Sequence, residues 1–143
     1  MNSRLDTIQA AILLVKFEAF NQYELREVNR IAEQYCKLLS DVVTQPIVPE
    51  GYVSSWAQYT IQLRNKSERD ALQAYLKEKK IPSMVYYPKP MHCQTAFQHM
   101  QGSMEYPVAD TLCSTVLSLP MHPYMSEEEI ISVSTAIQDF ITR

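Results

Sequence analysis

The stretch WAQYTIQLRNKSERDALQAYLKEKK (56–80) changes from one hydrophobic period to another, and this change indicates the class of the fold. Residues 56–63 alternate between two faces, which is typical of a β-strand. Ser67 and Asp70 then match the capping box that opens a helix, and the apolar residues after them recur at three- and four-residue steps up to Pro82. A strand followed directly by a helix indicates a domain that combines α and β structure.

The first forty residues predict a long helix. Their apolar residues recur at three- and four-residue steps, and no proline interrupts them before Pro46. Ser3, followed three residues later by Asp6, matches a capping box and predicts the start of this helix. Asn21 and Gln22 interrupt the apolar pattern, so we expect a kink or a break there.

Two short apolar runs that end at prolines predict further strands. Ser83–Tyr87 ends at Pro88 and Thr115–Leu119 ends at Pro120, because proline removes a backbone donor from the ladder. Between these two runs, the chain is expected to be helical only in pieces.

The last helix is predicted to begin at Ser126, which can form a further capping box with Glu129. The order helix, strand, helix, strand, strand, helix describes a two-layer α+β fold. At this length we expect one domain, residues 1–143, because a second independent core would need a longer chain. Within this domain, residues 1–45 form the long or kinked helix and residues 46–143 form a small α+β unit with a small sheet and helices.

The composition excludes several classes of protein. A net charge of -3 with interspersed signs creates no field that attracts nucleic acid, so no nucleic-acid partner is expected. The longest apolar run, residues 10–15, is far shorter than the roughly 20 residues of a membrane span, and no signal peptide is recognised. Cys36, Cys93 and Cys113 are too widely spaced for a secreted disulfide framework, which favours a cytoplasmic location.

Two segments carry side chains suited to binding. Prolines stiffen the segment Tyr86–His92, which holds two phenols and an imidazole at the end of a predicted strand. Asn2 and Arg4 lie beside a predicted helix start, where exposed amides favour an anion. Taken by composition alone, the first segment is more typical of aromatic core packing and the second of a solvated terminus.

No metal site is predicted. His92, Cys93 and His99 have no fourth ligand in recognisable spacing, and zinc needs three or four ligands in tetrahedral reach. Adjacent residues of an extended chain also point to opposite faces, so we expect Cys93 to be a passive thiol.

Three ordered motifs together resemble the sugar aminotransferases of the DegT/DnrJ/EryC1/StrS family: NSRLDTIQAAIL (2–13), YYPKPMH (86–92) and LSLPMHP (117–123). The resemblance runs over essentially the whole chain but covers only the last third or so of the family. It implies the small carboxy-terminal domain of a fold-type I pyridoxal-phosphate-dependent transferase. The helix in residues 1–45 would then link to a large cofactor-binding domain that this truncated chain lacks.

The resemblance also implies roles for individual residues. Asn2 matches the asparagine that reaches the cofactor phosphate of the partner subunit, and Arg4 matches the arginine that faces the nucleotide-sugar. Tyr86 and Tyr87 match a pair, often His-Tyr in the family, that lines the sugar pocket. A tyrosine at the first of these positions does not titrate near neutral pH as histidine does. His92 matches a histidine expected to make a weaker substrate contact.

The implied reaction transfers an amino group from glutamate to a nucleotide-linked keto-sugar, with pyridoxal phosphate as the cofactor and a homodimer as the assembly. No lysine lies in a setting that resembles the cofactor-anchoring lysine, so no catalytic residue is predicted and the isolated chain is expected to be inactive. Two alternatives stay open. One is a sugar dehydratase of the same family, in which histidine replaces that lysine. The other is a non-catalytic assembly module.

Overall fold

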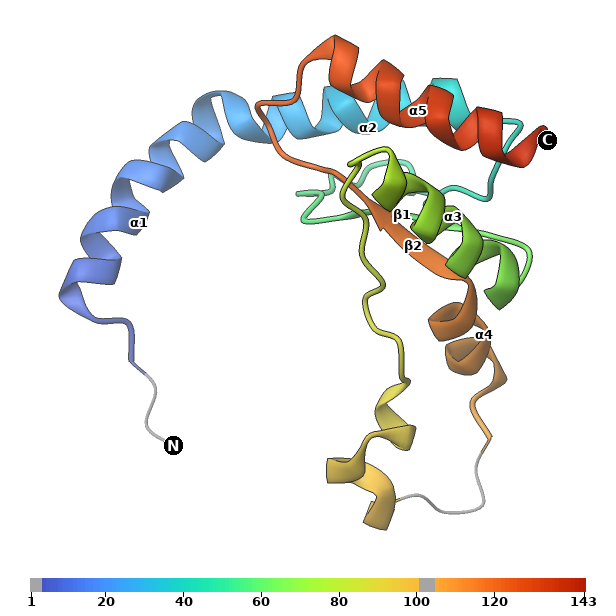
Figure 1. Cartoon of the computed structure of the whole chain (residues 1–143). Helices are drawn as coiled ribbons and strands as arrows, with labels where there is room; N and C mark the ends of the chain where they lie inside the picture. Colours follow the sequence, from blue (N-terminus) through green and yellow to red (C-terminus); the bar gives the residue numbers. More distant parts are fainter. Residues whose placement is uncertain (1–3, 101–104) are drawn as a thin grey trace.

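A computed structural model describes residues 4–100 and 105–143 of the chain. Figure 1 shows a long amino-terminal helix that leads into an α+β unit. The elements are α1 (Thr7–Ala19), the π-helical turn η1 (Phe20–Glu24), α2 (Leu25–Leu39), β1 (Tyr59–Gln62), α3 (Lys66–Glu78), the 3-10 turns η2 (Met91–Cys93) and η3 (Thr95–Met100), α4 (Pro107–Thr115), β2 (Val116–Leu119) and α5 (Glu127–Ile141). The expected α+β class is confirmed. Within the described residues, none of the helices is long and apolar enough to cross a membrane.

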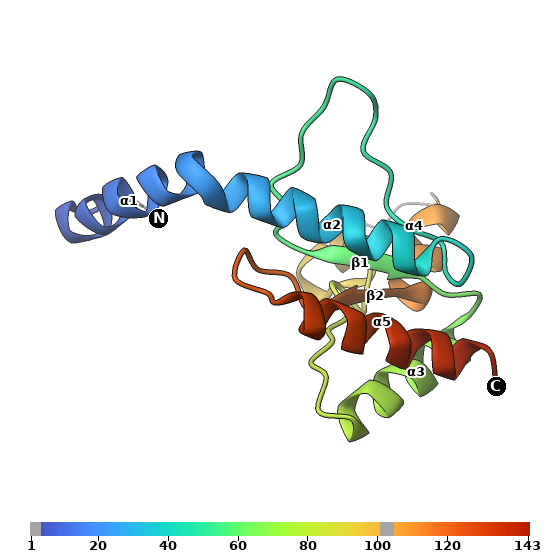
Figure 2. The ribbon, with the colours of Figure 1, turned by 90° about the horizontal axis from the view of Figure 1, so that it is seen from above.

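The core lies between the two-stranded sheet and three helices. β1 and β2 are antiparallel, with Tyr59 opposite Leu119 and Ile61 opposite Leu117. Helices α2 and α5 lie side by side over the sheet, and α3 packs next to α5 (Figures 1 and 2). Full burial of one large apolar side chain in this core contributes about 1.5–3 kcal/mol to the free energy of folding. The buried core comprises Ile31, Ala32, Tyr35, Leu39, Tyr59, Ile61, Leu63, Leu72, Leu76, Leu117, Leu119, Met125, Ile130, Val133, Ala136 and Ile137.

The predicted strand Ser83–Tyr87 is wrong. The described chain pairs this segment with the sheet only through one isolated bridge, Met84 to Ser118. Pro82 and Pro88 flank the segment and have no backbone donor, which leaves little room for a continuous ladder. The other two predicted strands are confirmed, although each is shorter than expected or shifted by one residue at its start.

The predicted break in the amino-terminal helix is confirmed as a π-helical turn. Asn21 and Gln22 both lie in η1, where the hydrogen-bonding pattern widens. The predicted start is wrong, because the helix begins at Thr7 and its N-cap is Asp6, whose carboxylate accepts from the Gln9 amide at 2.8 Å. Aspartate caps a helix as well as serine does. Ser3 lies outside the described residues.

Of the other two predicted helix caps, one is wrong and one is confirmed. Asn65, and not Ser67, caps α3, since its side-chain oxygen accepts from the Glu68 amide at 2.9 Å. At α5 the predicted capping box is confirmed, with Ser126 and Glu129 each accepting from the other's backbone amide.

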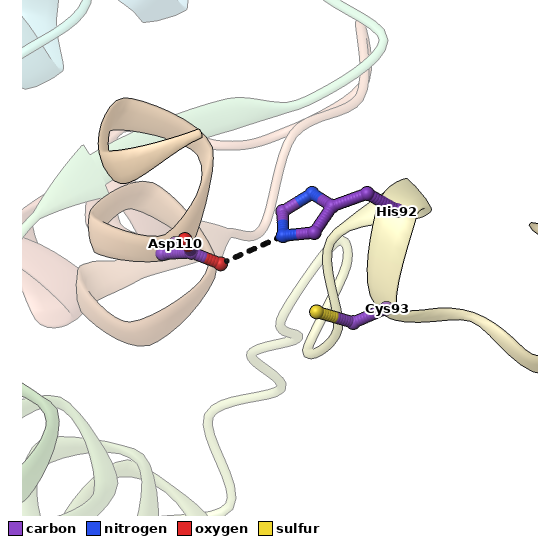
Figure 3. A group of neighbouring side chains, drawn as sticks. All are labelled: His92, Cys93 and Asp110. Atoms are coloured by element: carbon purple, nitrogen blue, oxygen red, sulfur yellow. Dashed lines mark ion pairs between the residues drawn. The ribbon is translucent and has the colours of Figure 1, made fainter. Parts of the chain in front are cut away.

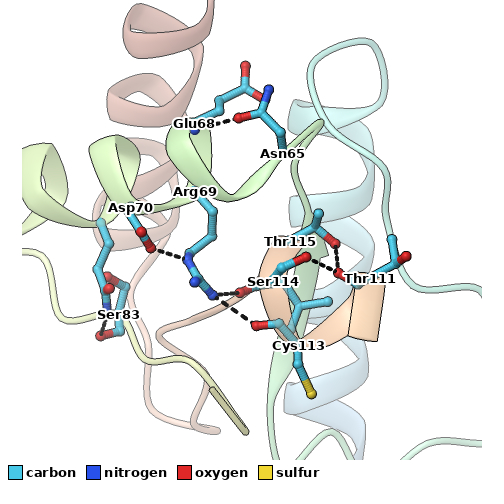
Figure 4. A network of polar contacts seen from close by, with 11 residues as sticks. Asn65, Glu68, Arg69, Asp70, Ser83, Thr111, Cys113, Ser114 and Thr115 are labelled. Carbon is cyan, nitrogen blue, oxygen red and sulfur yellow. Dashed lines mark hydrogen bonds and ion pairs between the residues drawn. The ribbon is translucent and has the colours of Figure 1, made fainter. Parts of the chain in front are cut away.

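A buried arginine ties α3 to the junction of α4 and β2. Figure 4 shows Arg69, which is 4% exposed, reaching from α3 toward the backbone of that junction. Its Nη1 donates to the carbonyl oxygens of Cys113 and Val116, at 3.4 and 3.3 Å, and its Nε donates to Asp70 at 2.6 Å. The guanidinium therefore satisfies two carbonyls where a helix turns into a strand.

Candidate functional site

Two of the three sequence motifs meet at one pocket. The Met84 amide donates to the Ser118 carbonyl at 3.1 Å, and the Ser118 amide donates back at 2.8 Å, so the segment before Tyr86 lies against β2. A pocket of about 270 Å³ opens beside this bridge. It is lined by Ala57, Gln58, Pro82, Ser83, Met84, Tyr86, Ser118, Leu119, Pro120 and Met121.

The two tyrosines of the second motif differ in their contact with the pocket. The peptide bond between Tyr86 and Tyr87 is cis, and Pro88 follows directly. Their rings lie edge to face with centroids 6.0 Å apart. Tyr86 is 43% exposed and lines the pocket, whereas Tyr87 is 70% exposed and is not among the lining residues. The structure therefore gives the two neighbours different surroundings.

The pocket combines apolar and uncharged polar side chains. Its lining includes a phenol, an amide and hydroxyls, and no ionisable acid or base of the described chain other than Tyr86. The Ser118 hydroxyl is already hydrogen-bonded to the Thr60 hydroxyl at 2.8 Å. Such a surface suits a ligand with hydroxyl groups better than it suits a phosphate, which would need cations or a helix start.

His92 is not among the residues that line this pocket. Its Nε2 lies 3.3 Å from the Asp110 carboxylate in α4, and its ring lies beside that of Tyr106 with centroids 4.9 Å apart (Figure 3). The imidazole therefore links the loop after the prolines to α4. Its predicted contact with substrate stays a prediction.

The structure does not bring Arg4 to the tyrosines. Asn2 lies outside the described residues, so its predicted cofactor contact has no structural description. Arg4 is exposed and precedes the cap of α1, which extends away from the small α+β unit (Figure 1). A single copy of this chain therefore does not unite Arg4 with Tyr86 in one site.

The residues present do not build a pyridoxal phosphate site by themselves. Every lysine is exposed, and none lines the pocket at Tyr86. Among residues 4–100 and 105–143, no carboxylate that could face the pyridine nitrogen and no cation that could hold a phosphate lines that pocket. The lysines are Lys16, Lys37, Lys66, Lys77, Lys79, Lys80 and Lys89.

A buried carboxylate at the helix bend was not foreseen from the sequence. Glu24, 4% exposed, accepts hydrogen bonds from Lys16 and from Tyr124, and Tyr124 also contacts the Tyr23 hydroxyl at 3.2 Å. The hydrogen bonds from Lys16 and Tyr124 lower the pKa of Glu24, and the bond to Glu24 raises the pKa of Lys16. The same carboxylate raises the pKa of Tyr124 to about 12. Tyr124 lies 100 residues from Glu24, so no local pattern could signal the pair.

Comparison with known proteins finds a matching family model and several relatives of this chain. The model of the DegT/DnrJ/EryC1/StrS aminotransferase family matches residues 1–138. The UDP-2-acetamido-2-deoxy-3-oxo-D-glucuronate aminotransferase of Pseudomonas aeruginosa is 38% identical over 96% of this chain and 37% of its own length. The UDP-N-acetyl-3-dehydro-alpha-D-glucosamine 3-aminotransferase of Acidithiobacillus ferrooxidans is 40% identical over 96% of this chain and 36% of its own length.

Solved structures agree with this placement. A DegT DnrJ EryC1 StrS aminotransferase from Brucella abortus superposes with a TM-score of 0.90 and 46% identity, over 100% of this chain and 38% of that one. The PLP form of a sugar aminotransferase from Streptococcus pneumoniae has the same fold, with a TM-score of 0.79 and 24% identity over 94% of this chain and 34% of that one. The chain thus spans little more than a third of the length of the relatives it matches.

Proposed function

Because this chain belongs to the DegT/DnrJ/EryC1/StrS aminotransferase family, we propose that it is part of a pyridoxal-phosphate-dependent enzyme that transfers an amino group from glutamate to a nucleotide-linked keto-sugar. The names of the two relatives support the substrate class, since both act on UDP-linked sugars with an oxidised carbon 3. We accordingly place the aminated position at carbon 3.

One observation supports the role of this chain within that enzyme. The pocket at Tyr86 is lined by apolar side chains and by the uncharged polar groups of Gln58, Ser83, Tyr86 and Ser118, and among the described residues neither a lysine nor another cation lines it. We therefore assign to this chain a wall of the sugar pocket, in which Tyr86 donates to a sugar hydroxyl and Tyr87 covers the entrance. The covalent chemistry of the cofactor, which supplies an electron sink for the substrate's carbon-nitrogen bond, belongs to residues that this chain does not supply.

In this proposal the two predicted amino-terminal residues, Asn2 and Arg4, act on the site of a second subunit. Arg4 lies at the far end of α1 from the small α+β unit, so in a homodimer it can face the nucleotide-sugar held by the partner subunit. Asn2 would reach the cofactor phosphate in the same way. A delocalised guanidinium suits a diphosphate because it binds two oxygens at once.

The test uses the longer enzyme encoded by the reading frame that contains this chain. Tyr86→Phe removes one hydrogen bond to the sugar, so we expect KM for a UDP-linked 3-keto-sugar to rise about tenfold. Tyr75→Phe is the matched control, because Tyr75 packs on Phe140 away from the pocket and should leave KM unchanged. Equal kinetics for both variants and the unaltered enzyme would contradict the assignment of the pocket.

The isolated chain provides a second test. Mixed with pyridoxal phosphate, it should show no saturable one-to-one cofactor-lysine adduct and no transamination. Either signal would overturn the proposal that the anchoring lysine lies elsewhere. The residue found at the anchoring position of the longer reading frame also decides the alternative chemistry, with lysine favouring transamination and histidine favouring dehydration.

A further inference from the structure

A group of three potential metal ligands lies outside the pocket at Tyr86. One donor atom each from His92, Cys93 and Asp110 lies within 4.8 Å of the other two. His92 and Cys93 come from η2, and Asp110 comes from α4 (Figure 3). These three residues are called the 92–93–110 cluster. They bring together η2 and α4, between which the turn η3 lies along the chain.

The 3-10 turn explains why the sequence does not predict this group. Neighbouring residues of an extended chain point to opposite faces, which argued against a joint role for His92 and Cys93. In a 3-10 turn, neighbouring side chains are rotated by about 120°, so both can reach one point. Pro90 is the N-cap of this turn, and the amide of Cys93 donates to the Pro90 carbonyl at 3.0 Å, which closes the turn.

The donor set has the chemistry of a zinc site. Imidazole nitrogen, thiolate sulfur and carboxylate oxygen are the three ligand types that Zn²⁺ takes in proteins. Tetrahedral Zn²⁺ keeps its ligand atoms about 3.3 to 3.7 Å apart, as follows from its usual bond lengths. The 3.3 Å between His92 and Asp110 already matches this spacing. The thiol lies within 4.8 Å of both other ligand atoms, so it would have to approach them by at most about 1 Å.

The surroundings favour a held imidazole and an open fourth position. The His92 side chain is 16% exposed and lies against the Tyr106 ring, which orients it, whereas the Asp110 side chain is 52% exposed. The cluster is therefore open to solvent on the side of Asp110. An ordinary histidine-aspartate ion pair would need no thiol, so Cys93 is the residue that distinguishes a metal site from a simple ion pair.

We propose that the 92–93–110 cluster binds one Zn²⁺ ion through His92, Cys93 and Asp110, with water as the fourth ligand. The ion would fasten η2 to α4 and so hold the end of the loop that carries Tyr86 and Tyr87. Binding would release the thiol proton, because the thiolate is the ligand. This inference does not depend on the proposed transamination.

The test titrates the metal-free chain with Co²⁺, which substitutes for zinc and reports a thiolate ligand by its charge-transfer absorption. We expect one Co²⁺ per chain, a thiolate-to-cobalt band, and displacement by one equivalent of Zn²⁺. Cys93→Ser should abolish the band, and both Cys93→Ser and Asp110→Asn should weaken Zn²⁺ binding at least about tenfold. The matched control Cys36→Ser, at an exposed thiol outside the cluster, should bind as the unaltered chain does.

A second measurement guards against variants that fail to fold. In the unaltered chain, Zn²⁺ should slow alkylation of Cys93 but not that of Cys36, and a chelator should restore the original rate. Absence of saturable one-to-one binding, or binding that Cys93→Ser leaves unchanged, overturns the proposal. Equal protection of Cys93 and Cys36 by Zn²⁺ overturns it as well, because that result indicates only nonspecific thiol binding.

Discussion

Glu24 is a carboxylate with 4% of its surface exposed, at the bend between α1 and α2. Its carboxylate accepts hydrogen bonds from Lys16, which lies in α1, and from Tyr124, which follows the third sequence motif. A buried carboxylate is stable only when its lone pairs are hydrogen-bonded, and these two donors meet that need. This one residue therefore joins the projecting helix to the loop before α5.

The pKa of Glu24 determines the direction of a pH effect. Its pKa is lowered, so its contribution to stability is present above about pH 4.5 and is lost as pH falls through the lowered value. We expect the thermal unfolding temperature to fall with acidification more steeply in the unaltered chain than in Glu24→Gln. The measurement is thermal unfolding followed by circular dichroism from pH 7 down to about pH 3.

The control for this experiment is Glu33→Gln, at an exposed position of α2. It should follow the unaltered chain at every pH. Parallel curves for Glu24→Gln and the unaltered chain would show that the carboxylate adds no acid-dependent stability. At the alkaline end the sign reverses, since the raised pKa of Lys16 means that its contribution is lost only as pH rises through that value.

At the scale of elements, helix α3 has two candidate N-caps, Asn65 and Ser67. The sequence matches a capping box at Ser67, but the extended backbone of Asn65 and its bond to the Glu68 amide make Asn65 the cap. Three further hydrogen bonds strengthen this end, because the Arg64 amide donates one and its guanidinium donates two to the Glu68 carboxylate. Asparagine and serine are comparable caps, so the sequence pattern alone could not choose between them.

We predict that Asn65→Ala lowers the free energy of unfolding by about 1 kcal/mol, because one backbone donor loses its acceptor. Ser67→Ala should change it by less than about 0.5 kcal/mol, since Ser67 lies inside the first turn and alanine favours helix. Urea unfolding of both variants measures the difference. If Ser67→Ala lowered the free energy of unfolding more than Asn65→Ala does, Ser67 would be the cap, as the sequence pattern predicts.

On the scale of the whole molecule, α1 exposes an apolar surface that nothing in the described chain covers. Leu14 is 74% exposed and Phe17 is 64% exposed, and both line an apolar hollow of about 520 Å³ between α1 and η1. Monomeric proteins rarely expose a continuous apolar surface of this kind. In the proposed enzyme this face would meet the remaining part of the parent chain or the dimer partner.

The isolated chain should therefore self-associate. Sedimentation velocity at increasing concentration should show a mass above that of one chain, and the double variant Leu14→Lys and Phe17→Lys should shift the distribution toward monomer. Ile47→Lys is the control, because Ile47 is 88% exposed but lies in the loop before β1, outside α1. A monomeric unaltered chain throughout this range would contradict the prediction.

The long-range contacts explain the limits of what could be predicted. The prediction of a strand at 83–87 was wrong because a strand there needs continuous pairing with β2, and the segment forms only a single bridge to β2. The link between His92 and Asp110 spans residues whose local patterns are unrelated, and the contact between Glu24 and Tyr124 joins segments 100 residues apart. A periodic pattern describes only residues within a few turns of one another.

The sequence by itself determined the class of the fold, most of the helices, two of the three predicted strands, the break at residues 21–22 and the family. These features depend on local periodicity, caps and short motifs, whose physics acts between neighbours along the chain. The tertiary structure alone decided which motifs share a pocket, that His92 faces Asp110, and that Glu24 is buried. These outcomes depend on packing between distant segments, because burial and hydrogen-bond partners are properties of the assembled molecule.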